Sequence, residues 1–319
     1  MPYEQRAHEA ADWARRYRLQ PAGASQPRIW LLLVDVQNTF CIPGFELFVA
    51  GRSGTGAVDD NVRLCQFVYR NLDLITNISA TMDTHLPQQV FHAIFFVDKD
   101  GHHPIPYTNI RAEELQSGKW QFNPDLAPGF GITPDYGQSM MLHYANELEQ
   151  HGKYTLTIWP YHAMLGGIGH ALVSAVEEAM YFHSMARLTQ PRFEVKGDRP
   201  FTEHYSVIGP EVTRGPGGEI LGRHNDTFLE TLKGVDAMLI AGQAKSHCVA
   251  WTVSDLLDDI RSADPALANK VYLLEDCTSP VVVPGADFTD AADAAFARFE
   301  AAGMHRVRST DFSFALPRG

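Results

Sequence analysis

A cysteine in the last third of the chain follows a strand-like run and begins a helical pattern. In VDAMLIAGQAKSHCVAWTVSDLLDDI, an apolar run enters a glycine-containing turn, and Cys248 then precedes apolar residues at helical spacing. The N–H groups and dipole of a helix N-terminus favour the nucleophilic thiolate and could also bind an oxyanion. Cys248 is therefore a candidate nucleophile. A small apolar residue packed at a strand–helix junction would give the same local pattern.

Two charged residues follow other strand-like runs. Asp35 comes near the end of RIWLLLVDV at 28–36, and Lys196 ends RFEVK at 192–196. A reacting thiol needs a base that takes its proton and a group that returns one to a leaving amine, and these residues could serve both needs. Each also has a simpler explanation, because an Asp after a strand often caps a turn and a Lys before Gly is often solvated.

Asp83 and His85 lie two residues apart in the segment TMDTH at 81–85. Side chains at positions i and i+2 of an extended segment point to the same side, so these two could bind one metal ion. A turn with a capping Asp is the alternative interpretation.

Strand-like runs and helical patterns alternate along most of the chain. The apolar runs lie at 28–36, 75–81, 192–196, 235–241 and 271–275, and the helical patterns at 58–73, 165–188, 248–263 and 287–302. This alternation predicts an open, mostly parallel α/β sheet with helices on both faces, in which sites form at the carboxyl ends of the strands. Asp35, Asp83, Lys196 and Cys248 all fall at or just after such ends.

The chain is expected to form one domain preceded by a short arm. Residues 3–18 have a helical pattern and 20–27 form a polar linker, so 1–27 is a helical arm and 28–319 a single domain. Two stretches of that domain, at about 98–152 and 209–226, have many turn residues and little periodicity. We interpret them as insertions that form a lid, a partner surface or small unrecognised elements.

Composition excludes several classes of protein. The 319 residues carry a formal net charge of −12, which argues against nucleic-acid and anionic-membrane partners. The first thirty residues lack a signal-peptide pattern, and no apolar run approaches membrane-spanning length, so we expect a soluble cytoplasmic protein. The other cysteines, Cys41, Cys65 and Cys277, are too dispersed for a disulfide framework, and no CxxC pair indicates a zinc site.

Several segments resemble, in the same chain order, the nicotinamidase branch of the isochorismatase-like cysteine hydrolases. The matching segments are VDVQNTF at 34–40, TMDTH at 81–85, WPYH at 159–162, KG at 196–197, EHYS at 203–206 and GQAKSHCV at 242–249. The resemblance covers about residues 28 to 310 with large insertions. An ordered series of this kind is much more specific than any one short motif.

The resemblance implies a fold and a reaction. The fold is a Rossmann-like three-layer α/β/α arrangement with a mostly parallel sheet. The reaction is hydrolysis of nicotinamide, or of a close aromatic amide, to the acid and ammonia through a thioester on Cys248. Asp35 then acts as base and Lys196 as the third catalytic member. The N–H groups of Ala244 and Cys248 form the oxyanion hole, and the peptide bond before Ala244 is cis.

The resemblance also implies a metal centre and a substrate pocket. His162 of WPYH joins Asp83 and His85 as a ligand of one divalent ion, with zinc the first expectation and iron or manganese also suited. His92 is a candidate fourth ligand. The metal would hold the ring nitrogen of a flat substrate between aromatic walls. The residues expected to line this pocket are Phe40, Trp159, Tyr205 and His247, of which Phe40 and Trp159 could equally belong to the core.

Three departures leave the substrate open, and one is the run VEEAMYFHSMARL, which predicts a long helix where the family often has a shorter connection. The nucleophile loop reads AKSHC, so Lys245 and Ser246 change its polarity relative to the family, and the chain is longer than usual members. A related amidase acting on a carbamoyl or ureido compound is one alternative, and a non-catalytic metal-binding protein on the same fold is another. Retention of all three metal ligands favours nicotinamide. The arm and insertions are compatible with a homo-oligomer.

Overall fold

The computed structural model describes residues 1–151, 154–283, 285–312 and 314, which form two compact units. The first unit comprises Met1–Met82, Ala171–Val195 and Asp226–Gly319, and the second comprises Asp83–His170 and Lys196–Asn225. None of the described helices combines the length and apolar character that a membrane crossing needs.

Among the described residues of the first unit, seven α-helices flank its sheet or connect its strands. They are α1 (Tyr3–Tyr17), α2 (Asn38–Cys41), α3 (Gly56–Arg70), α7 (Ser174–Arg187), α8 (Thr227–Gly234), α9 (Cys248–Ala263) and α10 (Thr289–Ala301). The strands of its sheet are β1 (Ile29–Val34), β2 (Asn77–Asp83), β7 (Arg192–Lys196), β8 (Ala237–Gly242), β9 (Val271–Leu274) and β12 (His305–Val307). A small hairpin pairs β10 (Val282–Val283) with β11 (Ala286–Asp287).

The six strands follow the order β12-β9-β8-β1-β2-β7. Strand β1 pairs in parallel with both β2 and β8, and β9 pairs in parallel with β8 and β12. All six residues of β1 and of β8 are buried, as expected for central strands covered on both faces. The last residues of β2 and β7, Asp83 and Lys196, belong to the second unit.

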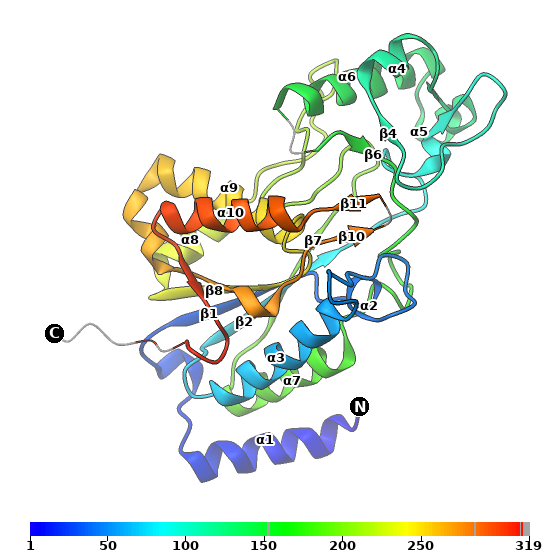
Figure 1. Ribbon diagram of the computed structural model, residues 1–319. Coiled ribbons are helices and arrows are strands. Elements are labelled where there is room, and N and C mark those ends of the chain that lie inside the picture. Colours follow the sequence, from blue (N-terminus) through cyan, green and yellow to red (C-terminus); the bar gives the residue numbers. More distant parts are fainter. Residues whose placement is uncertain (152–153, 284, 313, 315–319) are drawn as a thin grey trace. The chain divides into compact units, whose positions relative to one another are not determined.

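Helices cover both faces of this sheet and complete three layers (Figure 1). Helices α3 and α7 pack side by side on one face, and α1 packs outside them against α7. Helices α9 and α10 cover the other face, where α8 also contacts α9. The predicted α/β/α class with a mostly parallel sheet is therefore confirmed.

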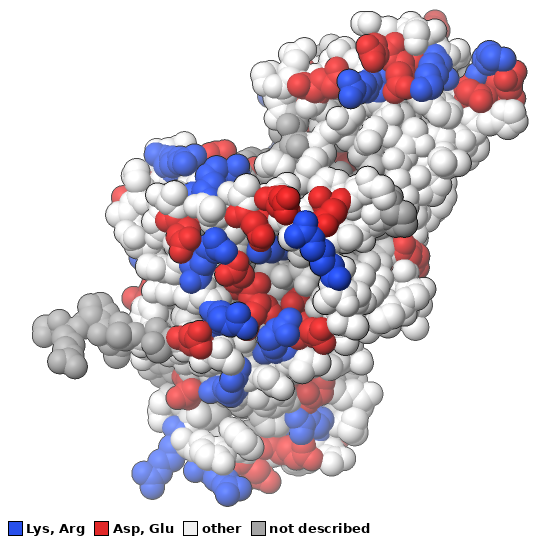
Figure 2. Space-filling view, in the orientation of Figure 1, with Lys and Arg blue, Asp and Glu red and all other residues white. Residues whose placement is uncertain are grey.

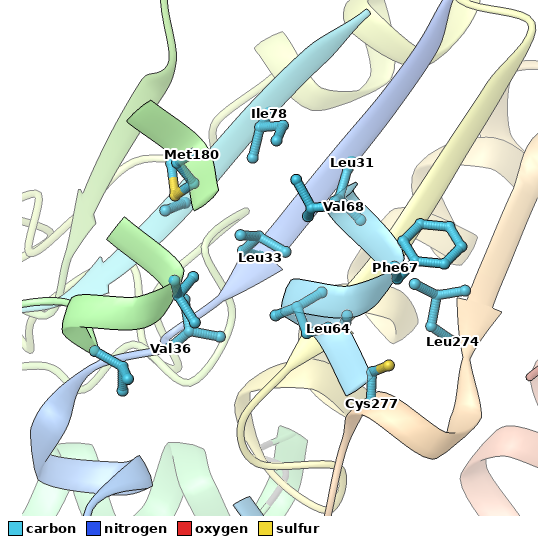
Figure 3. Packing of buried hydrophobic residues seen from close by; sticks show 14 of the residues in the cluster. Leu31, Leu33, Val36, Leu64, Phe67, Val68, Ile78, Met180, Leu274 and Cys277 are labelled. Atoms are coloured by element: carbon cyan, nitrogen blue, oxygen red, sulfur yellow. The ribbon is translucent and has the colours of Figure 1, made fainter. Parts of the chain in front are cut away.

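A large hydrophobic cluster of the core lies between β1 and the helices α3 and α7 (Figure 3). Leu31 and Leu33 point from β1 toward Leu64 and Phe67 of α3, and Met180 of α7 lies on the same side. These side chains are almost completely buried. Their burial is the main force that holds β1 in place, and it thereby fixes the position of the residue that follows β1.

The second unit contains the stretch at 98–152. Its helices are α4 (Ala112–Gln116), α5 (Ala127–Phe130) and α6 (Pro134–His151), and its strands pair as β3 (Phe96–Val97) with β5 (Gln121–Phe122) and β4 (Asn109–Ile110) with β6 (Leu156–Thr157). The expectation of little periodicity there was wrong for α6. Its buried residues recur at helical spacing behind an initial Pro134, a favourable first helical residue.

The helices predicted at 58–73, 248–263 and 287–302 agree with α3, α9 and α10 to within three residues at each end. The helix predicted at 165–188 begins only at Ser174, because Gly166 takes a left-handed conformation (φ 84°) and the segment before Ser174 forms turns. Helix α8 and strand β12 were not predicted. Lysine and arginine side chains are interspersed with aspartate and glutamate on the face shown in Figure 2.

Candidate functional site

The sequence-predicted site residues fall into two sets, each inside one compact unit. Asp35, Phe40, Ala244, His247 and Cys248 belong to the first unit. Asp83, His85, His92, His162, Trp159, Lys196 and Tyr205 belong to the second.

Cys248 is the first residue of α9 and follows β8 through a five-residue loop, 243–247. It is 8% exposed, and its helix is 16 residues long. The peptide bond between Gln243 and Ala244 is cis, as the family resemblance implies. Several N–H groups of this region donate hydrogen bonds: Lys245 to Ser279 O, and His247 and Val249 to Ala244 O. The Ala244 N–H, in contrast, donates to no group among the residues that the structure describes, which suits an oxyanion donor.

Asp35 follows β1 directly and is completely buried. Its backbone is left-handed (φ 47°), a conformation that Asp tolerates better than most residues. Thr81 of β2 holds it twice, because Thr81 Oγ1 accepts from the Asp35 N–H at 3.0 Å and donates to Asp35 Oδ1 at 2.5 Å. The carboxylate is thus oriented by a strand neighbour, and Thr81 is a supporting residue that sequence reasoning missed.

Asp83, His85 and His162 place their ligand atoms within 4.8 Å of one another. Nε2 of His85 lies 2.8 Å and Nε2 of His162 lies 3.6 Å from Asp83 Oδ2. All three side chains are buried. One carboxylate and two imidazoles that converge in this way suit a divalent transition metal.

The imidazole rings are held in the tautomer that metal binding needs. Nδ1 of His85 donates to Gly197 O at 3.1 Å, and Nδ1 of His162 donates to Pro160 O at 2.7 Å. Each Nε2 therefore carries a lone pair that faces Asp83 and the other histidine. Burial lowers the pKa of His162, which keeps this ring neutral. The residues fit a bound metal.

His92 lies beside this set but outside it. Its ring centroid is 6.1 Å from that of His85, and its Nδ1 donates to Pro87 O at 3.2 Å. Nε2 is buried and has no hydrogen-bond partner among the described residues. Burial lowers the pKa of His92 to about 3. Its role as a fourth ligand stays a prediction.

Lys196 contacts Asp83 of the candidate metal centre. Its Nζ donates to Asp83 Oδ1 at 2.8 Å and to His204 O at 3.1 Å, and only 3% of the residue is exposed. Although burial by itself raises the pKa of Asp83, interactions with His85, with the Lys196 ammonium and with His162 lower it well below its ordinary value. The Asp83 carboxylate thus presents one oxygen to Lys196 and the other to the two histidines.

Gly197 forms the wall behind these groups. It has a left-handed conformation (φ +87°), and an added Cβ would lie 2.9 Å from His85 Cε1 and 3.0 Å from Asp83 Oδ1. Only glycine fits there without moving a ligand. The KG segment contains this glycine, but its position along the chain does not link it to the candidate metal ligands.

Two of the predicted pocket residues contact each other in the second unit. Trp159 Nε1 donates to Tyr205 OH at 3.1 Å, and both residues are buried. Tyr205 also hydrogen-bonds Glu203, whose pKa is raised well above its ordinary value by burial and by the charge of Glu211. In the first unit, Phe40 is buried in α2, and the ring of His247 packs 4.9 Å from that of Phe288.

Lys245 and Ser246, the two loop residues that differ in polarity from the family, contact other residues of the first unit. Lys245 Nζ lies 2.6 Å from Asp293 Oδ1 and 4.7 Å from the centroid of Phe296. Ser246 Oγ accepts from the Val281 N–H at 3.0 Å and lies 2.8 Å from Nδ1 of His247. Lys245 and Ser246 therefore anchor the loop to α10 and to the residue directly before β10.

Solved structures share this fold. The nicotinamidase and pyrazinamidase structure from Acinetobacter baumanii has a TM-score of 0.52 at 19% identity, with 90% of this chain and 99% of that chain covered. The yeast nicotinamidase bound to the inhibitor nicotinaldehyde has a TM-score of 0.52 at 17% identity, covering 88% and 99% of the two chains. Another structure of the yeast nicotinamidase has a TM-score of 0.50 at 19% identity, with the same coverage. No protein-family model and no curated protein matches the sequence. The chain therefore has the fold of the nicotinamidases, as its sequence resemblance to the isochorismatase-like hydrolases implies.

Proposed function

We propose that this protein is a metal-containing cysteine amidohydrolase that converts nicotinamide, or a close aromatic amide, to the acid and ammonia. The observation that carries the proposal is the position of Cys248 as the first residue of α9, in a loop where the Ala244 N–H has no acceptor among the described residues. A thiolate at a helix N-terminus with nearby amide donors is equipped for acyl transfer. The shared nicotinamidase fold supports the substrate class.

The reaction is assigned to residues as follows. Asp35 takes the proton of Cys248, and the thiolate attacks the amide carbonyl while the N–H groups of Ala244 and Cys248 stabilise the oxyanion. Lys196 supports the thiolate electrostatically. Asp35 returns this proton to the amide nitrogen, which leaves as ammonia. Water, deprotonated by Asp35, then hydrolyses the thioester and releases the acid.

Asp83, His85 and His162 would hold the metal, for which zinc is our first choice. The bound ion would supply a Lewis acid that binds the ring nitrogen of the substrate. Trp159 and Tyr205 would contribute aromatic walls to the substrate pocket, and Phe40 and His247 stay candidate substrate contacts. Nε2 of His92 would add a fourth protein ligand.

Ammonia release from a panel of amides, with and without chelation of metal, tests this proposal. Nicotinamide should be hydrolysed fastest, ahead of carbamoyl and ureido compounds, and activity should be lost on chelation and restored by added zinc. Turnover of nicotinamide that survives complete metal removal would contradict the role of the three ligands. Slow alkylation of Cys248 by iodoacetamide at neutral pH, without turnover of any amide, would favour a non-catalytic protein.

A further inference from the structure

Gln243 lies directly before Ala244, the proposed oxyanion donor. Hydrogen bonds at both ends of its side-chain amide fix the Gln243 side chain. Gln243 is 1% exposed. Its Nε2 donates to Asp60 Oδ2 at 2.8 Å, and its Oε1 accepts from the Ser279 N–H at 3.2 Å. Its own N–H donates to Val34 O at 2.7 Å. Both ends of the side-chain amide and the backbone N–H are therefore satisfied.

Asp60 reaches this amide from α3. It is 2% exposed, and burial raises its pKa, while hydrogen bonds from Ser279, Gln243 and Arg63 act in the opposite direction. Arg63 Nη2 lies 2.9 Å from Asp60 Oδ1, and Arg63 Nε donates to Asp276 O. A buried carboxylate is tolerated only when such donors surround it, and they also fix its orientation.

The surroundings leave Asp60 and its partners little freedom. An added Cβ on Gly56, four residues before Asp60, would lie 2.6 Å from Ser279 Oγ and 2.9 Å from Ala50 O. The Ser279 carbonyl accepts from the Lys245 N–H at 2.8 Å, so Ser279 contacts the loop on both sides of Ala244. Helix α3, the segment after η5 (Glu275–Cys277) and the nucleophile loop thus meet at one amide side chain.

We propose that Asp60 is a positioning residue that, through the Gln243 side chain, holds the Ala244 N–H in the orientation that stabilises the oxyanion. This inference rests on the proposed function. Rotation of the Gln243–Ala244 peptide plane would turn the Ala244 N–H, and the hydrogen bonds to Asp60 and Ser279 resist that rotation. Asp60 itself touches no reacting atom.

Two substitutions separate this role from simple stabilisation. Asp60→Asn removes the charge that pairs with Arg63 and leaves one acceptor oxygen where Gln243 and Arg63 use two. Gln243→Met keeps the side-chain length but removes both amide hydrogen bonds. Asp276→Asn is the matched control. Its carboxylate accepts from Ser309 N at 2.7 Å and Ser309 Oγ at 2.9 Å, in the same network but without contact to Gln243.

We expect Asp60→Asn and Gln243→Met each to lower kcat for ammonia release about tenfold, with KM and the rate of iodoacetamide alkylation at Cys248 little changed. The double variant should lose no more than Gln243→Met alone, because Asp60 acts through that side chain. Asp276→Asn should lower the Tm and keep kcat. If Asp60→Asn unfolds the protein, Gln243→Met alone still carries the test.

Three results would overturn the inference. Unchanged kcat in Gln243→Met would show that its hydrogen bonds do not position the loop. Losses that multiply in the double variant would show that Asp60 acts by another route, and an equal loss of kcat in Asp276→Asn would show a general structural effect. Wild-type protein that releases no ammonia from any amide would overturn the proposed function and this inference with it.

Discussion

Lys196 Nζ donates a 2.8 Å hydrogen bond to Oδ1 of Asp83, whose other oxygen faces the two histidines of the proposed metal centre. One carboxylate thus connects the proposed catalytic ammonium with the metal ligands. Lys196→Met would leave Asp83 buried without this donor. We expect metal affinity and kcat to fall, each by at least about tenfold, measured by competition with a chromophoric chelator and by ammonia release.

Lys270→Met is a suitable control for that experiment. Nζ of Lys270 donates to backbone carbonyls, including Val235 O at 2.7 Å, and the residue belongs to neither set of site residues. Its removal should leave metal affinity and kcat unchanged. Wild-type metal affinity in Lys196→Met would show that the Lys196–Asp83 pair does not support the ligand.

Gly197→Ala should disrupt the metal centre. The new methyl group would meet His85 and Asp83 at about the distances given above, and the left-handed backbone adds strain. We expect loss of most metal binding and activity. Gly101→Ala is the control, because Gly101 has a similar backbone conformation (φ +82°) but nothing lies within 4 Å of the added Cβ. This variant should show the same backbone strain and still bind metal. Equal metal binding by the two variants would count against the close packing of Gly197.

Stability should fall in mild acid because of His183. This residue is completely buried, its Nε2 donates to Ile75 O at 2.9 Å, and burial lowers its pKa to about 4. The unfolded chain, with an ordinary histidine pKa of about 6.5, binds the proton first as the pH falls. This contribution to stability is therefore complete above about pH 6.5 and is lost toward pH 4, at up to about 1.4 kcal/mol per pH unit.

Denaturant unfolding at several pH values measures this slope. His183→Gln should reduce the slope between pH 6.5 and 4, whereas His8→Gln, a change of an exposed histidine in α1, should not. Identical slopes in the wild type and His183→Gln would refute the assignment.

Arg187 should anchor the linker that follows α1. It is completely buried, its Nε donates to Gln20 O at 2.8 Å, and its Nη2 donates to Ser25 Oγ at 2.6 Å. Arg187→Met should cost about 3 kcal/mol of unfolding free energy, because several buried carbonyls lose their donor, and should speed proteolysis within 18–27. The exposed Arg192→Met is the control. Unchanged proteolysis in Arg187→Met would show that the linker is held by other contacts.

Much of the fold could be predicted because its central strands carry a strong signal. The runs that became β1 and β8 are continuously apolar, and such runs are typical of strands covered on both faces. Glycine turns and amphipathic helices marked the boundaries that followed them. Helix α6 was not predicted, because the turn residues around it obscured the helical spacing of its buried residues.

The residues of the candidate site could be predicted from the sequence, but most of the contacts between them could not. Asp83, His85 and His162 converge as expected, because each lies in a short motif with few alternative uses. The Lys196–Asp83 pair joins residues far apart in the sequence, and no spacing rule indicates it. The link from Asp60 to Gln243 likewise depends on how α3 packs against the nucleophile loop.

Formation of a thioester on Cys248 is the central claim, and mass spectrometry of intact protein, acid-quenched during nicotinamide turnover, tests it most directly. We predict a transient acyl adduct at Cys248 that disappears when nicotinamide is exhausted. Cys248→Ala should show neither the adduct nor ammonia release. Ammonia release by Cys248→Ala at the wild-type rate would contradict the claim.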